Sequence, residues 1–336
     1  MKFRLVGLLM VIALMGAFFV ARSGPSIAPD YETVSMVEGK PEIAVDIPAG
    51  SSGSEIARLL FENGIIKSSE AYFRVAVGDK RSESVAPGNH RLTLKISAKQ
   101  ALEQLLDADR IPNLIRMYEG GWKSEVITSL VNYGFTRGEI DKALDTVVLP
   151  NGFRDSEGLL FPAQYSFTKG TSALQAVQAM VDRFTAEPIA KQLLAGSKDF
   201  SSLQLLTIAS IVQAEGDEKD FAKVSQVIRN RLKIGMPLQM DSTVHFIKKV
   251  RGQIFLSSNS TLINSPYNTY KRYGLPPGPI GSPGVAAMTA ALNPASGDSL
   301  YFITVAPGDT RFTKSNDEFN TWKALYVKNR KAGAFN

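Results

Sequence analysis

The most informative pattern of hydrophobic positions in this chain ends in an acid. Ile208, Ile211 and Val212 share one face of a predicted helix with the acid that follows them, Glu215. If that face is buried, it carries a carboxylate inward, and burial raises a carboxyl pKa towards the range that a general acid needs near neutral pH. The same pattern also fits an acid that only caps or pairs with a neighbouring element.

The residues around this acid predict where its helix begins and ends. Ser201 and Gln204 form a capping box, and Gly216 predicts the end of the helix. A second helix is predicted over 219–234, where an apolar stripe at helical spacing stops at Gly235. Further on, the pattern predicts a helix at 285–292, a strand at 300–305 and a terminal helix at 317–328.

The N-terminal half contains an internal repeat. Segments 46–64 and 116–134 each read as a strand, a glycine turn, an amphipathic helix and a glycine stop. Between them the pattern predicts helices at 71–77 and 98–106 and a strand at 85–96. Residues 41–108 therefore form a predicted β-α-α-β-α module, and the whole chain is predicted to be α+β.

The N-terminus predicts a membrane anchor. Residues 5–21 are uncharged and almost wholly apolar, and at 1.5 Å per residue they would span roughly 25 Å, enough for a bilayer core. Lys2 and Arg4 precede the run and favour an N-in orientation, whereas Arg22 weakens that bias. A cleaved signal peptide is the alternative, and either reading places the remaining residues outside the cytoplasm.

Composition narrows the chemistry. The 336 residues are 44% hydrophobic with a net charge of +6, which suits an anionic surface or polymer but identifies no partner. There is no Cys, so thiol nucleophiles and cysteine-ligated metals are excluded, and the two histidines, His90 and His245, are interpreted as packing or surface residues. No phosphate loop and no nucleic-acid motif occurs, so we expect no cofactor, no metal and no nucleic-acid partner.

Residues 264–284 form the most unusual segment of the sequence. Five prolines and four glycines exclude regular structure there. Three tyrosines and two asparagines distinguish it from a simple linker. A rigid loop that presents aromatic and amide groups suits a carbohydrate or peptide groove, and a structural loop packed on the core fits equally well.

Six blocks of the chain resemble, in order, motifs of the YceG-like or MltG family of endolytic transglycosylases, which cleave bacterial peptidoglycan. They are Glu-Gly-Leu-Leu-Phe-Pro at 157–162, Ala-Ser-Ile-Val-Gln-Ala-Glu at 209–215, Asn-Arg-Leu at 230–232 with Gly-Met at 235–236, Leu-Gln-Met-Asp-Ser-Thr-Val at 238–244, Tyr-Asn-Thr-Tyr at 267–270 and Gly-Leu-Pro-Pro-Gly-Pro-Ile at 274–280. One block is weak, but six in this order are specific. The resemblance covers roughly residues 40–330.

The resemblance implies a domain organisation. Residues 1–22 would be the transmembrane anchor, 23–40 a tether, 41–108 a LysM-like module of a kind often associated with glycan binding, and 109–336 the catalytic domain. The partners implied are peptidoglycan glycan strands, with peptidoglycan synthases as possible neighbours at the outer face of the cytoplasmic membrane.

The resemblance also implies a mechanism centred on Glu215. This residue would protonate the glycosidic oxygen and then act as a base, leaving a 1,6-anhydro end. Two alternatives stay open from the residues: a glycan-binding scaffold without turnover, and a hydrolase in which Glu218 or Asp241 activates water. The candidate substrate contacts are Asn230, Gln239, Asp241, Tyr267, Asn268 and Tyr270, with Glu157 as a supporting residue.

Overall fold

The computed structural model describes residues 28–33, 39–48, 50–112, 114–251 and 259–335. The predicted anchor at 1–22 lies outside the described residues, and within them no helix is long and apolar enough to span a bilayer. The described chain is a mixed α+β structure with twelve α-helices and three small two-stranded antiparallel sheets. It divides into two compact units, Met1–Pro112 with Ser166–Lys169, and Asn113–Tyr165 with Gly170–Asn336.

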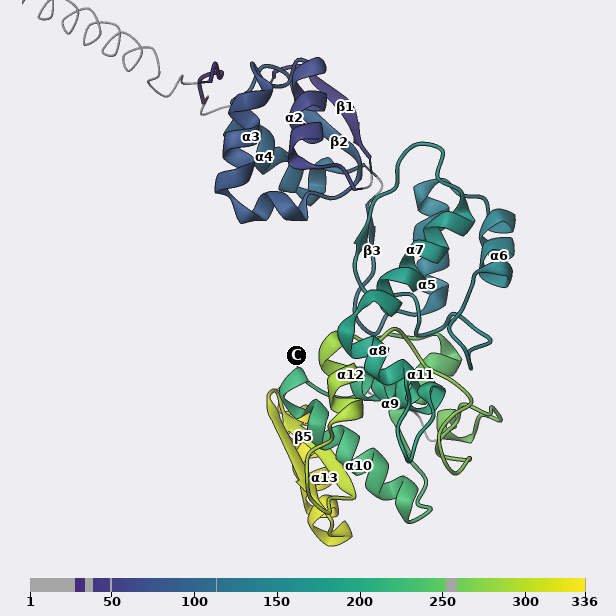
Figure 1. Cartoon of the computed structure of the whole chain (residues 1–336). Coiled ribbons are helices and arrows are strands. Elements are labelled where there is room, and N and C mark those ends of the chain that lie inside the picture. Colours follow the sequence, from purple (N-terminus) through teal and green to yellow (C-terminus); the bar gives the residue numbers. More distant parts are fainter. Residues whose placement is uncertain (1–27, 34–38, 49, 113, 252–258, 336) are drawn as a thin grey trace, which may run out of the picture. The chain divides into compact units, whose positions relative to one another are not determined.

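The first unit follows the predicted order of elements. It runs β1 (Glu42–Ile47), α2 (Gly53–Glu62), α3 (Ser69–Gly78), β2 (Gly88–Thr93) and α4 (Ala98–Leu106), with short 3₁₀ turns at Lys80–Ser84 and Ala108–Arg110. The strands pair antiparallel, and the three helices pack together beside them (Figure 1). Their apolar faces form one core, which includes Val45, Ile47, Leu60, Tyr72, Leu92 and Leu102.

Part of the segment predicted as a tether packs on this unit. Ala28 is buried in its core, and the Asp30 carboxylate accepts the backbone N–H of Ala98 at 3.0 Å. Because Ala98 is the first residue of α4, Asp30 satisfies a donor that has no partner inside the helix. Residues 28–33 therefore belong structurally to the first unit.

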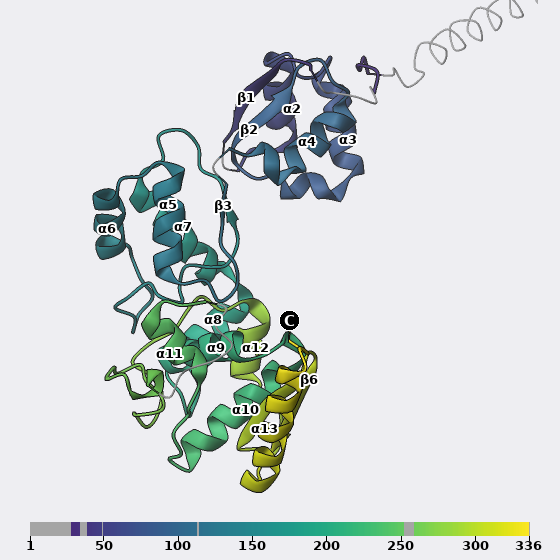
Figure 2. The same ribbon diagram turned by 180° about the vertical axis from the view of Figure 1, so that it is seen from behind.

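The second unit contains the remaining elements. Its first part is β3 (Ile115–Arg116), α5 (Lys123–Tyr133), α6 (Arg137–Thr146), β4 (Gln164–Tyr165), α7 (Ala173–Ala186) and α8 (Pro188–Leu194). Its second part is α9 (Ser202–Glu215), α10 (Phe221–Lys233), α11 (Asp241–Lys248), α12 (Val285–Leu292), β5 (Tyr301–Ala306), β6 (Asp309–Thr313) and α13 (Asn316–Lys331), with 3₁₀ turns at Glu218–Asp220 and Ser260–Leu262. The α13 helix lies along the β5–β6 hairpin (Figure 2).

The predicted repeat is present at the level of local structure. A strand leads to a glycine turn and a helix in both copies, β1 with α2 and β3 with α5. Gly64 and Gly134 follow the two helices with φ of 69° and 126°, backbone that favours glycine. Glycines at these places are therefore required by the end of each helix.

Helix α9 is central to the second unit. Its capping box at Ser201 and Gln204 is confirmed, and it ends at Glu215 because Gly216 turns to extended backbone. The face that carries Ile208, Ile211 and Val212 is buried, and burial extends to every residue from 205 to 212. Helices α8, α10, α11 and α12 all pack against α9, so no side of that stretch meets solvent.

The loop at 264–284 is irregular, as predicted, and α9 holds it in place. The Ser210 hydroxyl accepts the backbone N–H of Ile280 at 3.0 Å, and the Gln213 side chain accepts that of Gly284 at 2.9 Å. These two polar residues of the buried helix therefore satisfy backbone donors that regular structure would otherwise pair.

Candidate active site

A cavity of about 860 Å³ opens where the end of α9 meets the start of α11. Residues of α10, β5 and α13 form its other walls. Charged, polar and aromatic side chains line it, among them Glu215, Arg231, Gln239, Asp241, His245, Tyr270, Tyr301, Phe319, Lys323 and Tyr326. Its size and mixed lining fit a polar organic ligand of several rings.

Glu215 lies at the junction of two helices. Its Oε1 accepts a hydrogen bond from the backbone N–H of Ser242 at 3.0 Å. Ser242 is the second residue of α11, so the carboxylate meets a helix N-terminus, which favours negative charge. Loss of hydration outweighs this bond and raises the pKa of Glu215 to about 7. A group with that pKa can donate a proton and later take one back.

Arg231 is a buried cation of the same cavity that the sequence analysis did not select. Its Nε donates to the Leu300 carbonyl and its Nη1 to the Leu238 carbonyl, both at 2.6 Å. Within the described part of the chain, no carboxylate lies within ion-pair distance of it. Its charge acts to lower the pKa of Glu215, although burial has the larger effect. Arg231 therefore stabilises the ionised acid.

Periodicity could have found Arg231. It follows Ile228 by three residues and Val224 by seven, so it shares the apolar face of α10. The reasoning that selected Glu215 applies equally to this position.

Asp241 provides the opposite charge in the cavity. It is the first residue of α11, and its carboxylate accepts the hydroxyl hydrogen of Tyr270. Its negative charge acts to raise the pKa of Glu215. His245, one turn further along α11, also lines the cavity, and burial lowers its pKa. The earlier interpretation of His245 as a packing or surface residue omitted this position.

Three predicted contact residues are engaged elsewhere. The Asn230 side chain donates to the carbonyls of residues 297 and 299, joining α10 to the segment before β5. Asn268 is fully buried and donates to the carbonyls of residues 261 and 263. Tyr267 packs against Phe246, with 5.1 Å between ring centroids. None of these three side chains is among those that line the cavity.

Two other acids also lie away from the cavity lining. Glu218 is exposed on the 3₁₀ turn that follows Gly216, because α9 does not continue past Glu215. Glu157 is buried, and its Oε1 accepts the backbone N–H of Lys123 at 3.0 Å, at the start of α5. Burial raises the pKa of Glu157 to about 7. Gln239, by contrast, is exposed at the cavity with φ of 49°.

The cavity therefore holds one partly buried acid, Glu215, whose pKa is about 7. Arg231 acts to lower that pKa and Asp241 acts to raise it. Among the described residues, no group of three or more His, Asp or Glu side chains is placed to hold a metal ion. Such an arrangement is suited to acid–base chemistry on a polar ligand.

The chain belongs to the YceG-like family, whose family model matches residues 45–324. It is 30% identical over 315 residues to a Bacillus subtilis protein named endolytic murein transglycosylase, and the match covers 87% of each chain. A Streptococcus pneumoniae protein of the same name is 27% identical over 329 residues, covering 87% of this chain and 59% of that protein.

A solved structure supports the same assignment. The 2.6 Å crystal structure of a YceG-like protein from Listeria monocytogenes matches with a TM-score of 0.56 and 30% identity. The match covers 84% of this chain and 99% of that one.

Proposed function

We propose that this chain is a lytic transglycosylase that cleaves peptidoglycan glycan strands internally, with Glu215 as its acid and base. The single observation that carries the proposal is the position of Glu215, which lines one cavity with Arg231 and Asp241 and accepts the backbone N–H of Ser242 near the start of α11. Burial there raises its pKa to about 7. Membership of the YceG-like family and the names of its relatives support this choice of substrate.

The proposed reaction begins with protonated Glu215. Its proton passes to the glycosidic oxygen between N-acetylmuramic acid and N-acetylglucosamine as the bond from C1 to that oxygen breaks. The ionised carboxylate, favoured by the Ser242 N–H and Arg231, then removes the proton from the C6 hydroxyl of the muramic acid. That oxygen bonds to C1, so a 1,6-anhydro end forms and no water is consumed.

One carboxylate is sufficient for these two proton transfers. Asp241 would tune Glu215 and contact the sugar, and Gln239 and Tyr270 would contribute further polar groups from the same cavity. The position of Asp241 also favours a second candidate, a hydrolase in which that carboxylate activates water or attacks C1. The products distinguish the two reactions.

The test compares purified full-length wild type with Glu215→Gln and Glu218→Gln on isolated peptidoglycan, with products read by mass spectrometry. Wild type and Glu218→Gln, the exposed control, should release 1,6-anhydro ends. Glu215→Gln should be slower by at least about a hundredfold, because its amide cannot donate an acidic proton. Reducing ends from wild type would instead establish a hydrolase, and binding without any cleavage would establish a scaffold.

We further propose the cellular setting. An anchor at 1–22 would hold the enzyme at the outer face of the cytoplasmic membrane. Residues 41–108 would act as a LysM-like module and 109–336 as the catalytic domain. From that position the enzyme could trim or terminate new strands beside peptidoglycan synthases. Protease accessibility of the C-terminal region in spheroplasts would test the orientation.

A further inference from the structure

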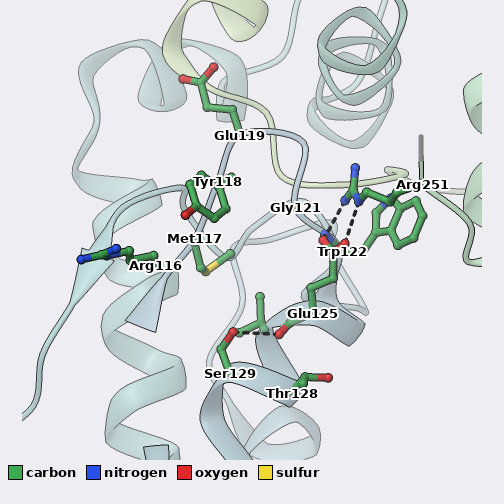
Figure 3. Close-up of a pocket in the computed structure, with 11 residues that line it drawn as sticks. Arg116, Met117, Tyr118, Glu119, Gly121, Trp122, Glu125, Thr128, Ser129 and Arg251 are labelled. Atoms are coloured by element: carbon green, nitrogen blue, oxygen red, sulfur yellow. Dashed lines mark hydrogen bonds and ion pairs between the residues drawn. The ribbon is translucent and has the colours of Figure 1, made fainter. Parts of the chain in front are cut away.

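The second unit contains another cavity, of about 510 Å³, built around the start of α5. It shares no lining residue with the cavity of Glu215. Figure 3 shows the side chains that line it. They are mainly Met117, Tyr118, Trp122, Glu125, Val126 and Arg251.

A fixed polar group lies at this cavity. Arg251 pairs with Glu125 through two parallel contacts, Nε to Oε1 at 2.6 Å and Nη2 to Oε2 at 2.7 Å. The guanidinium carbon lies 3.9 Å from the centre of the Trp122 ring, and Nη2 also donates to the Gly120 carbonyl at 2.8 Å. Both side chains of the pair are nearly half exposed, so the pair adds little to stability. The two parallel contacts and the stacking on Trp122 orient the guanidinium and the carboxylate, which suits recognition of a ligand.

Aromatic surface surrounds that polar group. The Trp122 indole is largely buried and forms part of the lining, whereas Tyr118 is 73% exposed. An exposed tyrosine at the edge of a cavity leaves a flat face for a ligand to cover. The lining contains two arginines and two glutamates, so its formal charges cancel. A cavity without net charge does not favour a strongly charged ligand.

These features together suit a neutral sugar ring. Such a ring offers C–H groups on its face, which pack on aromatic rings, and hydroxyl or amide groups at its edge, which bond to a carboxylate–guanidinium pair. We propose that this cavity binds an N-acetylhexosamine unit of the same glycan strand that Glu215 cleaves. This inference rests on the proposed function for the source of the sugar.

The fold connects the two cavities. The second residue of helix α11, Ser242, is bound to Glu215, and the helix ends at Lys248, three residues before Arg251; its eight residues extend about 12 Å. The loop that carries Tyr118 is also tied to α9 through the 264–284 loop: the Gly120 N–H donates to the Ser282 carbonyl at 2.7 Å, and the Gly284 N–H donates to the Gln213 side chain of α9 at 2.9 Å. A sugar held by this cavity would therefore help to position the strand at Glu215.

A fluorescence titration tests the proposal directly. The chain contains two tryptophans, so Trp322→Phe leaves Trp122 as the sole indole reporter. Full-length protein carrying Glu215→Gln and Trp322→Phe would be titrated with tetra-N-acetylchitotetraose, a β-1,4-linked probe that it should not cleave. Adding Tyr118→Ala should raise the Kd for the probe about threefold to tenfold, the range expected for one lost ring contact. Tyr273→Ala is the matched control and should leave the affinity unchanged, because Tyr273 is 74% exposed but lines neither of the two cavities.

The active enzyme provides a second readout. Tyr118→Ala should raise KM for long glycan strands by a similar factor while kcat stays the same, because the residue holds the strand without touching the reacting atoms. No fluorescence response to the probe, or equal affinity with and without Tyr118, would overturn the inference. If a Tyr118-dependent response persists while the wild type yields no anhydro ends, the proposed function fails and the sugar site stands.

Discussion

Glu215 is subject to two opposing influences. Burial favours its protonated form, whereas the helix N-terminus and Arg231 favour its ionised form. An acid that must give up a proton and then recover one benefits from this balance, since neither state is strongly preferred near pH 7. Because the proposed reaction starts from protonated Glu215, kcat/KM should fall about tenfold per pH unit above the pKa of Glu215.

Arg231 and Asp241 should shift the alkaline limb of the pH profile of kcat/KM in opposite directions. Arg231→Met removes a cation and should shift the limb to higher pH, because the Glu215 pKa rises. Asp241→Asn removes an anion and should shift it to lower pH, in each case by on the order of half a unit or more. The measurement is the pH profile of kcat/KM on peptidoglycan.

The controls separate charge from structure. Arg231→Lys keeps the charge and should leave the limb near that of wild type, and melting curves would show whether each variant is folded. Complete loss of activity in folded Asp241→Asn would contradict a tuning role and support a hydrolase that uses Asp241 directly.

At the residue level, the sequence predicted several residues of the cavity but not all of its lining. Spacing and motif order selected Glu215. They also selected Asp241, Gln239 and Tyr270, which line the same cavity. Asn230 and Asn268 belong to the same motifs, yet they bind backbone carbonyls. A sequence motif does not distinguish an amide that holds a loop from one that faces a ligand, because both require a hydrogen-bonding side chain.

At the element level, helices rich in strong helix formers were predicted well, and elements of weaker propensity were missed. The helices at α4 and α12 match their predicted ranges, and both consist mainly of residues such as Ala, Leu and Met. No helix was predicted at α11 and no strand at β6. Helix α11 is as long as α12, but it consists largely of β-branched, aromatic and small polar residues, which favour a helix less. Helix α11 matters most, since its N-terminus binds Glu215 and could not be placed from local sequence.

The start of α5 gives a prediction about stability. Glu157 accepts the Lys123 N–H, and burial raises its pKa to about 7, above the ordinary value of 4.5. Between these values, the unfolded state ionises first as pH rises, so the folded state loses stability up to about pH 7. Glu157→Gln keeps an acceptor oxygen without the charge.

This variant should therefore be more stable than wild type at pH 8, by about 1–3 kcal/mol, and nearly equal at pH 4. Urea unfolding at the two pH values measures the difference, with pH 4 as the internal control. A variant that is equally destabilised at both values would indicate a packing role and contradict the electrostatic explanation.

At the scale of the whole molecule, the described residues form two separate hydrophobic cores. One surrounds Leu60 in the first unit, and the other surrounds Leu206 in the second. The units are not simply consecutive, because Ser166–Lys169 belongs to the first unit although its neighbours in sequence belong to the second. The resemblance implied two modules, 41–108 and 109–336, and nothing in the sequence predicted that residues 166–169 belong with the first unit. A fragment cut at 112 would lose a segment of its own unit, so the folding test requires the whole chain.

Two cores predict two unfolding events. Leu60 and Leu206 are both fully buried, and replacing either with alanine should cost its own unit about 2–5 kcal/mol through lost burial and a residual cavity. In calorimetry of the full-length protein, Leu60→Ala should lower the midpoint of one transition and Leu206→Ala that of the other. Each variant serves as the control for the other, because the two have the same chemistry and burial but lie in different cores. A single transition that both substitutions lower equally would show that the units unfold as one cooperative body, and that the second core depends on the first for its stability.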